Sequence, residues 1–166
     1  MLGMARGGLR NRLSAALSRL VRRPSPAPGS ASPAGSPSIA DEIGYAPRPD
    51  GLPDPGEIVW GWVPYDEGDG RGKDRPILVI GRRGADLLGL QLTSKDHHRD
   101  AEDEARWGRY WADIGTGDWD ARRRQSEVRL DKLLVLDPAQ VRREGAALDR
   151  PRFDRVIAEA RRVQGW

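Results

Sequence analysis

The chain of 166 residues contains no cysteine, only two histidines and no apolar run that approaches the ~20 residues of a membrane-spanning helix. It therefore forms no disulfide, has no thiol nucleophile and builds no cysteine-ligated zinc site. The two histidines are adjacent and make a poor ligand set, so we expect neither a metal nor another cofactor. We also expect no stable membrane insertion. The lack of cysteine is compatible with a reducing cytoplasm, where we place the protein.

The basic isoelectric point of about 9.7 belongs to the N-terminal part of the chain. Residues 1–50 carry seven arginines and three acidic residues, whereas residues 51–166 carry 21 Lys and Arg against 22 Asp and Glu. A nucleic-acid interface in the second part must therefore rest on local clusters of cations rather than on the global charge.

Two kinds of sequence make up an N-terminal arm that we expect to span residues 1–55. Residues 9–23 place leucines at helical spacing among arginines, which predicts a short basic amphipathic segment. Such a segment is compatible with contact to a membrane surface, RNA or a partner, with a transit peptide, or with a plain extension from a misassigned start. Residues 24–55 are rich in Pro, Ser, Ala and Gly, so we expect an extended or disordered linker.

The composition changes at Gly56, and we expect one folded domain over residues 56–166. Short apolar runs separated by turn residues predict strands at residues 57–63, 76–81, 86–93, 109–114 and 127–136. Pro76 would stand first in its strand, where its missing N–H is tolerated.

Helices are expected only near the end of the chain. Asp137 and Pro138 predict the start of a short helix over residues 137–145. An apolar stripe predicts an amphipathic helix over residues 150–164. Strands followed by closing helices predict a mainly β fold, a small antiparallel, partly closed barrel with C-terminal helices packed at its end.

The glycine-rich stretch Glu67–Arg83 has features of a phosphate-binding loop, but its context excludes one. Lys73 is followed by Asp74, not by the Ser or Thr of a Walker loop, and a β-branched run rather than a helix comes next. The stretch instead joins two strands through roughly ten polar or glycine residues and should be mobile. On these residues alone, a flexible hairpin tip without function remains an alternative.

Four short motifs, taken in order and spacing, resemble the MazF/PemK family of toxin components from bacterial toxin–antitoxin pairs. The motifs are Gly56–Val59, Lys73–Ile80, Leu92–Ser94, and Ser126–Val128 leading to Leu136 and Asp137. The resemblance covers about residues 55–160. It implies an SH3-like barrel of the MazF/PemK/CcdB type that forms a homodimer. It also implies metal-independent cleavage of single-stranded RNA, usually mRNA, held off by a cognate antitoxin protein.

The resemblance also assigns residues to the site. The functional arginine of the family, just before the proline of its strand, falls on Arg75. The functional threonine, at the end of the next strand, falls on Thr93, with Ser94 beside it. We expect Arg71, Lys73 and Lys95 around these positions to contact RNA. The chain departs from the family at Asp131-Lys132, where related sequences often carry Glu-Gln or Asp-Gln.

The chemistry of these residues suits cleavage by the 2′-OH of the RNA, which gives 2′,3′-cyclic phosphate and 5′-OH ends. Attack on the phosphorus requires a proton acceptor, a cation facing the phosphorane and a donor for the leaving oxygen. The guanidinium of Arg75 matches phosphate oxygens with its fork of donors, so we assign it electrostatic stabilisation first and acid catalysis second. The hydroxyls of Thr93 and Ser94 can bind phosphate or position the 2′-OH. Ordinary strand packing is the alternative for Thr93.

Further residues admit two interpretations each. His97 and His98 can form an acid–base pair beside the site, or they can be solvated residues of a highly charged loop. The tryptophans can stack on unpaired bases, although filling a small core or a dimer interface is the more common use. The arginine triplet at residues 122–124 can follow an RNA backbone or keep a hairpin end soluble.

Three functions are compatible with these patterns. The first is a sequence-selective endoribonuclease toxin. The second is a toxin like CcdB, which shares the barrel architecture, binds gyrase and cleaves no RNA. The third is a non-catalytic RNA-binding or regulatory module. The pairing of an arginine with a threonine favours the first function.

Overall fold

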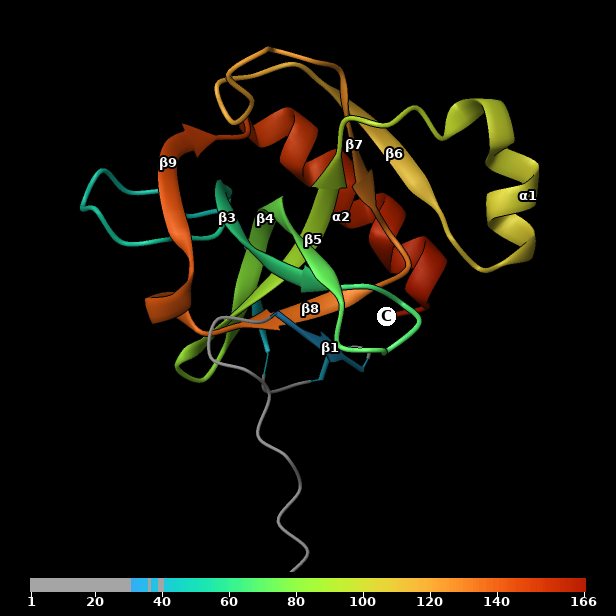
Figure 1. Ribbon diagram of the computed structural model, residues 1–166. Coiled ribbons are helices and arrows are strands. Elements are labelled where there is room, and N and C mark those ends of the chain that lie inside the picture. The colour runs from blue at the N-terminus through green and yellow to red at the C-terminus, as the bar shows by residue number, and fades with distance from the viewer. Residues whose placement is uncertain (1–30, 36, 39–40) are drawn as a thin grey trace, which may run out of the picture.

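The structure is a computed structural model that describes residues 31–35, 37–38 and 41–166 (Figure 1). The side chains of His98 and of residues 143–145 are not described. The expected basic amphipathic segment at residues 9–23 lies outside the described residues. Within the described ranges, no helix is long and apolar enough to cross a membrane.

The described chain is mainly β structure with one long C-terminal helix, as the sequence predicts. Its strands and helices, in chain order, are β1 (Ser32–Ala34), β2 (Glu42–Ile43), β3 (Glu57–Pro64), β4 (Gly72–Arg83), β5 (Asp86–Thr93), η1 (His98–Asp100), α1 (Ala101–Arg106), β6 (Trp111–Gly115), β7 (Ser126–Arg129), β8 (Leu133–Leu136), η2 (Pro138–Gln140), β9 (Arg142–Ala147) and α2 (Arg150–Gln164).

All of the strand pairs are antiparallel, and the main path of the sheet runs β1-β8-β5-β4-β3-β9. Strand β5 has two partners on the same side. Its first half, at Leu87–Gly89, pairs with β8, and its end, at Leu92 and Thr93, pairs with β7, which in turn pairs with β6. Irregularities in the β3–β9, β4–β5 and β6–β7 pairings mark bulges, which bend strands. The sheet therefore curls into the partly closed barrel that the sequence predicts.

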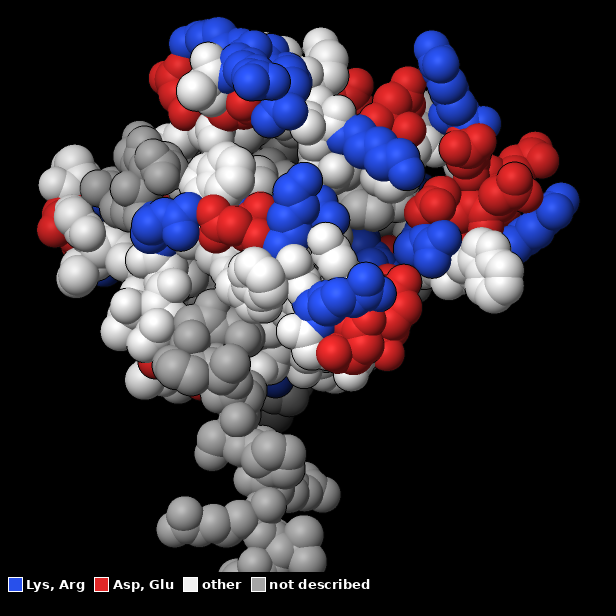
Figure 2. Space-filling view, viewed as in Figure 1, with Lys and Arg blue, Asp and Glu red and all other residues white. Residues whose placement is uncertain are grey.

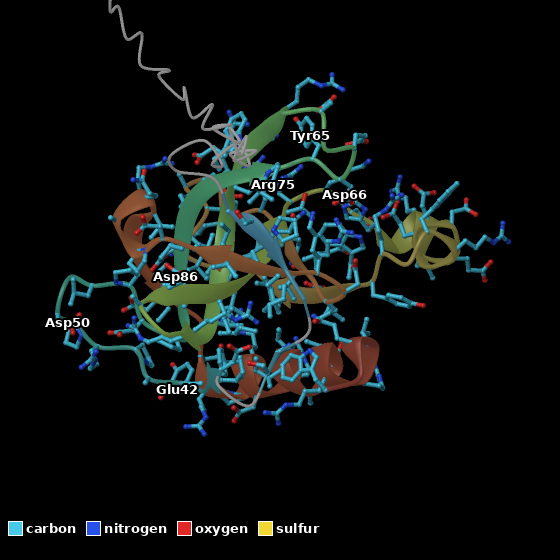
Figure 3. The ribbon with its side chains drawn as sticks, turned by 90° about the horizontal axis from the view of Figure 1, so that it is seen from below. Glu42, Asp50, Tyr65, Asp66, Arg75 and Asp86 are labelled. Carbon is cyan, nitrogen blue, oxygen red and sulfur yellow. The ribbon has the colours of Figure 1, made fainter. Side chains whose placement is uncertain are left out.

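Helix α2 packs against the core of this barrel. It begins at the cap Asp149, whose side chain accepts a hydrogen bond from the backbone N–H of Arg152, and Pro151 stands in its first turn. Its buried residues, Phe153, Val156, Ile157 and Ala160, join a cluster with the inner side chains of the barrel strands. The apolar stripe expected over residues 150–164 is thus confirmed, and α2 covers the barrel away from Arg75 (Figure 3).

The prediction of a helix over residues 137–145 is wrong beyond its first turn. Asp137 does cap the chain, and its carboxylate accepts from the N–H of Ala139 at 2.8 Å, but only the short η2 follows. Strand β9 then pairs with β3. The cap at Asp137 is predicted correctly from local sequence. The following residues form a strand because they pair with the edge of β3, and no local signal reveals this pairing.

The single strand expected over residues 127–136 is two strands. Asp131 and Lys132 lie in the turn between β7 and β8, which pair with different parts of β5. Pro76 also differs from expectation, because β4 already begins at Gly72. Pro76 pairs with Trp60 of β3, whereas the pairing of β4 with β5 begins only at Ile77, so the missing N–H lies on an edge.

Two short segments ahead of Gly56, β1 and β2, belong to the sheet, although the sequence suggested a linker there. Strand β1 pairs with β8, and β2 pairs with β4. The backbone N–H of Ala31 donates to the carbonyl of Trp62 at 2.8 Å, and Ala31 is buried in a second apolar cluster with Val59 and Leu134. These two strands are therefore not free linker but pair with the barrel.

Candidate functional site

A cleft of about 650 Å³ opens where the β3–β4 loop, the beginning of β4 and the end of β5 meet the residues around α1. It is lined by Pro64, Tyr65, Asp66, Glu67, Arg71, Lys73, Arg75, Gln91, Thr93, Ser94, Lys95, His97, Glu104, Arg109, Trp111 and Arg129. In Figure 3, Arg75 lies near Tyr65 and Asp66, whereas Glu42, Asp50 and Asp86 lie toward the other end of the barrel. The two segments that the sequence assigns to the site, around Arg75 and around Thr93, therefore share one cleft.

Arg75 is held on rigid structure at the edge of this cleft. It lies within β4, opposite Gly61 of β3 and directly before Pro76. The β3–β4 loop is therefore shorter than expected: it covers residues 65–71 and is closed by a hydrogen bond from the N–H of Tyr65 to the carbonyl of Arg71. Arg75 is not part of the loop but of the strand behind it.

The lack of a carboxylate partner within the described residues distinguishes Arg75 from the other arginines of the cleft. Each of the other cleft arginines has a carboxylate partner: Arg71 contacts Asp69, Arg109 contacts Glu104, and Arg129 contacts Asp66 and Asp131. Arg75 makes no hydrogen bond or ion pair within the described part of the chain. The same holds, among the described residues, for the side chains of Lys73 and Lys95. The cleft thus carries cations whose charge is available for an anion.

Thr93 and Ser94 bring hydroxyl groups to the same place. Thr93 ends β5 opposite Glu127 of β7 and is 8% exposed, so its position is fixed by the sheet. Its Oγ1 accepts a hydrogen bond from the N–H of Lys95 at 3.2 Å. Its hydroxyl hydrogen is left to donate into the cleft. Ser94 is exposed and also lines the cleft.

Of the two histidines, the structure brings His97 into the cleft. Its ring stacks flat on that of Trp111, with centroids 4.0 Å apart and an interplanar angle of 1°. Its backbone N–H donates to Glu127 at 3.0 Å. Burial lowers the pKa of His97 below 6.5; Lys95, Arg109 and Arg75 lower it further, and Glu104 opposes them. The imidazole is therefore neutral at neutral pH. The side chain of His98 lies outside the described part of the structure.

Glu104 of α1 organises this wall of the cleft. Its carboxylate accepts hydrogen bonds from Arg109 at 2.8 and 3.1 Å and from Trp111 Nε1 at 3.2 Å. It also lies 3.7 Å from Nδ1 of His97. The hydrogen bond from Arg109 is the main reason that the pKa of Glu104 falls to about 2. The carboxylate is ionised at neutral pH and fixes the indole on which His97 stacks.

Asp131 and Lys132, which depart from the family pattern, hold the opposite side of the cleft. Arg129 donates to Asp131 and, at 2.8 Å, to Asp66 of the β3–β4 loop. Lys132 donates to the other oxygen of Asp66 at 2.8 Å. Burial alone would raise the pKa of Asp66, but the hydrogen bonds from Lys132 and Arg129 lower it. This network connects the loop to the β7–β8 turn.

Several cleft residues were not identified from the sequence. Arg129 could have been found from the alternation along its strand, because side chains two apart share a face of a strand. No comparable signal marked Glu104, since its segment reads as a solvated charged loop and α1 was not expected. Arg109 and Trp111 belong to the strand expected at residues 109–114, but nothing in that pattern indicates that they face the site. Within the described residues, no group of three or more His, Asp or Glu side chains is arranged to hold a metal ion.

The fold and the cleft together define a class: a small antiparallel barrel that presents unpaired cations and hydroxyl groups in an open, polar cleft. Residues 54–163, more than half of the chain, match the family described as "PemK-like, MazF-like toxin of type II toxin-antitoxin system". The chain belongs to this family and is a MazF/PemK-type toxin.

A solved structure titled as the MazE-MazF complex (Form-II) from Deinococcus radiodurans is similar to this chain at 20% sequence identity and a TM-score of 0.42. The match covers 70% of this chain and 95% of that one. No curated protein sequence matches the chain.

Proposed function

We propose that the protein is a metal-independent endoribonuclease that cleaves single-stranded RNA, mRNA above all, at short sequence motifs. The observation that carries the proposal is the unpaired guanidinium of Arg75, set in a strand beside the hydroxyls of Thr93 and Ser94. Unpaired cations on a fixed scaffold stabilise the phosphorane-like transition state more strongly than the ground-state phosphodiester, because the transition state carries more negative charge.

Each step of the reaction has a candidate group in the cleft. His97, neutral because of its lowered pKa, accepts the proton of the 2′-OH as the 2′-oxygen attacks the phosphorus. Arg75 binds the non-bridging oxygens, and Thr93 and Ser94 position the phosphate by hydrogen bonds. The bond from phosphorus to the 5′-oxygen then breaks. The leaving oxygen takes a proton from water in the open cleft, because arginine is a weak proton donor.

We propose that the other cations of the cleft bind the backbone of the RNA. Lys73 and Lys95 lie on either side of Arg75 and Thr93 in sequence and line the same cleft. Arg71 also lines it, although Asp69 already occupies its Nε at 2.6 Å. We propose that Lys73 and Lys95 contribute more to RNA affinity than Arg71, because no internal carboxylate competes for them within the described residues.

The family description names a toxin–antitoxin system, and the proposal extends it to partners. We propose a homodimer in the cytoplasm whose activity is blocked by a cognate antitoxin. An acidic or extended segment of that antitoxin would compete with RNA for Arg75 and the two lysines.

The test is incubation of the purified protein with a long RNA in the presence of EDTA. We expect the wild-type protein to cut the RNA and Arg75→Ala to be slower by about 10²–10³, the cost of removing one donor that faces developing negative charge. Arg106→Ala is the control, because Arg106 is exposed and lies outside the cleft. No cleavage by the wild type, or equal rates for wild type and Arg75→Ala, would contradict the proposal.

A further inference from the structure

A second, smaller hollow adjoins the cleft at Arg75. It measures about 110 Å³ and shares Lys73, Arg75, Thr93 and Ser94 with the cleft. Its remaining walls are Trp60, Asp74, Pro76, Leu92, Asp120, Arg124 and Ser126. Arg75, Thr93 and Ser94, which are proposed to act on the scissile phosphate, therefore line both hollows, and an RNA strand continues beyond that phosphate.

One additional cation, Arg124, faces this second hollow on a fixed support. Its Nε donates to Asp120 Oδ2 at 2.7 Å, and its Nη2 approaches Oδ1 at 3.4 Å. Asp120 is only 7% exposed and also accepts from the N–H of Arg122 at 3.0 Å. The guanidinium is thus oriented along one side by Asp120, and its Nη1 has no partner within the described residues.

The loop that carries Arg124 is connected to the barrel by side-chain hydrogen bonds. Trp119 is 3% exposed and donates from Nε1 to Ser126 Oγ at 3.0 Å. Trp60 of β3 donates from Nε1 to the carbonyl of Trp119 at 3.2 Å. Two walls of the hollow, Trp60 and Ser126, are therefore part of the same network, which limits the freedom of Arg124.

The neighbouring arginines of the triplet differ from Arg124. Arg122 and Arg123 do not line either hollow, and Arg123 pairs with the exposed Asp118. Basic side chains gather over the β6–β7 connection in Figure 2, while acidic side chains gather around α1. The basic cluster alone does not identify a site, but the orientation of one member into a hollow does.

The size of the hollow limits what it can bind. At about 110 Å³ the hollow has about a sixth of the volume of the cleft, which suits one phosphate group better than a longer segment. We propose that it is a phosphate subsite for the nucleotide adjoining the cleaved linkage, with Arg124 binding the phosphate of that nucleotide. This inference rests on the proposed function and deepens it.

The subsite has a measurable electrostatic signature. Each phosphate contact on a single strand contributes about 0.7 to the slope of log K against log salt concentration. Binding of a fully 2′-O-methylated, random-sequence RNA, which cannot be cleaved, is measured by fluorescence anisotropy over a range of salt. We expect Arg124→Ala to weaken binding about tenfold and to lower the slope by about 0.7. Arg123→Ala is the matched control, and we expect it to leave the slope unchanged.

A second measurement places the contact at one phosphate. The cut position is first mapped, and RNAs are then made with a single neutral methylphosphonate at the phosphate on either side of it. In the wild type, one of the two replacements should slow cleavage about tenfold, and in Arg124→Ala the same replacement should have no further effect. A merely structural role of Arg124 would leave the two effects additive.

The outcomes separate the subsite from the proposed reaction. A lower slope for Arg124→Ala alone supports the subsite, even if the wild type binds RNA without cleaving it, a result that would refute only the nuclease proposal. Equal slopes for wild type and both variants, or additive effects in the methylphosphonate series, overturn the subsite while leaving cleavage at Arg75 intact. No RNA binding by the wild type overturns both.

Discussion

Arginines with and without a carboxylate partner lie in the same cleft. Arg129 has two carboxylate partners and a side chain that is 9% exposed, so its charge is used within the protein. Arg75 lines the same cleft without an internal partner among the described residues. The same residue type therefore serves two purposes a short distance apart, and only the environment distinguishes them.

His97 leads to a prediction of pH dependence. Its pKa is lowered below 6.5, mainly by burial, so a mechanism with His97 as base loses activity only when the pH falls below that value. We expect kcat/KM to be flat above pH 6.5 and to fall on the acid side. In His97→Gln, we expect a lower rate without this acid limb, and His98→Gln should retain it. A wild-type profile without an acid limb, or its loss in His98→Gln instead, would contradict the assignment.

The same shift affects stability with a defined sign. Because the pKa of His97 is lower in the folded than in the unfolded chain, the unfolded state binds the proton first as the pH falls. The contribution of His97 to the free energy of unfolding is therefore complete above about pH 6.5 and is lost as the pH falls through the folded pKa. Activity and stability limits consequently fall in the same acid range, and thermal melts at each pH separate them.

Among the elements, the β3–β4 loop is held by a contact that no pattern in the sequence indicates. Asp66 connects it to Arg129 of β7 and to Lys132 after it. We expect Asp66→Asn to weaken both ion pairs and to increase amide hydrogen exchange across residues 65–71. Asp69→Asn is the control, since the bonds of Asp69 among the described residues stay within the loop, to Arg71. Equal exchange in both variants would show that the Asp66 contacts do not restrain the loop.

The elements that could be predicted from the sequence are those with a strong local pattern. The alternation along β3 and β5 and the apolar stripe of α2 are local, because burial on one face repeats at the period of the element. Strand β9 and the split between β7 and β8 depend on which edge of the barrel is free, and α1 has no buried residue. Non-local pairing of that kind leaves no trace in the adjacent residues.

The site also contains residues that could be assigned from the sequence and residues that depend on contacts between distant segments. Arg75 and Thr93 are assigned through the resemblance to the family, whose functional arginine and threonine fall on them, and the structure brings both into one cleft. The stack of His97 on Trp111 could not be predicted, since it depends on Glu104 receiving hydrogen bonds across a turn. Arg124 could not be separated from Arg122 and Arg123 by sequence either, because only the position of Asp120 distinguishes them.

At the scale of the whole molecule, the barrel extends further toward the N-terminus than its motifs suggest. Residues 31–35 contribute β1 and the buried Ala31. We expect a variant that lacks residues 1–35 to melt at least about 4 °C below one that lacks residues 1–30, because the former loses the β1–β8 pairing. The two melting temperatures, measured side by side, give the contribution of this short segment. Equal values would show that β1 adds nothing to stability.

We propose that this barrel cleaves RNA by attack of the 2′-OH beside Arg75, without a metal. The most direct test uses an RNA with one mapped cut site, in EDTA, and identifies the new ends by mass spectrometry. We predict a 2′,3′-cyclic phosphate and a 5′-OH, and no cleavage of the same RNA with a single 2′-deoxy sugar at the cut position. A 5′-phosphate end, or unchanged cleavage of the 2′-deoxy RNA, would contradict the account.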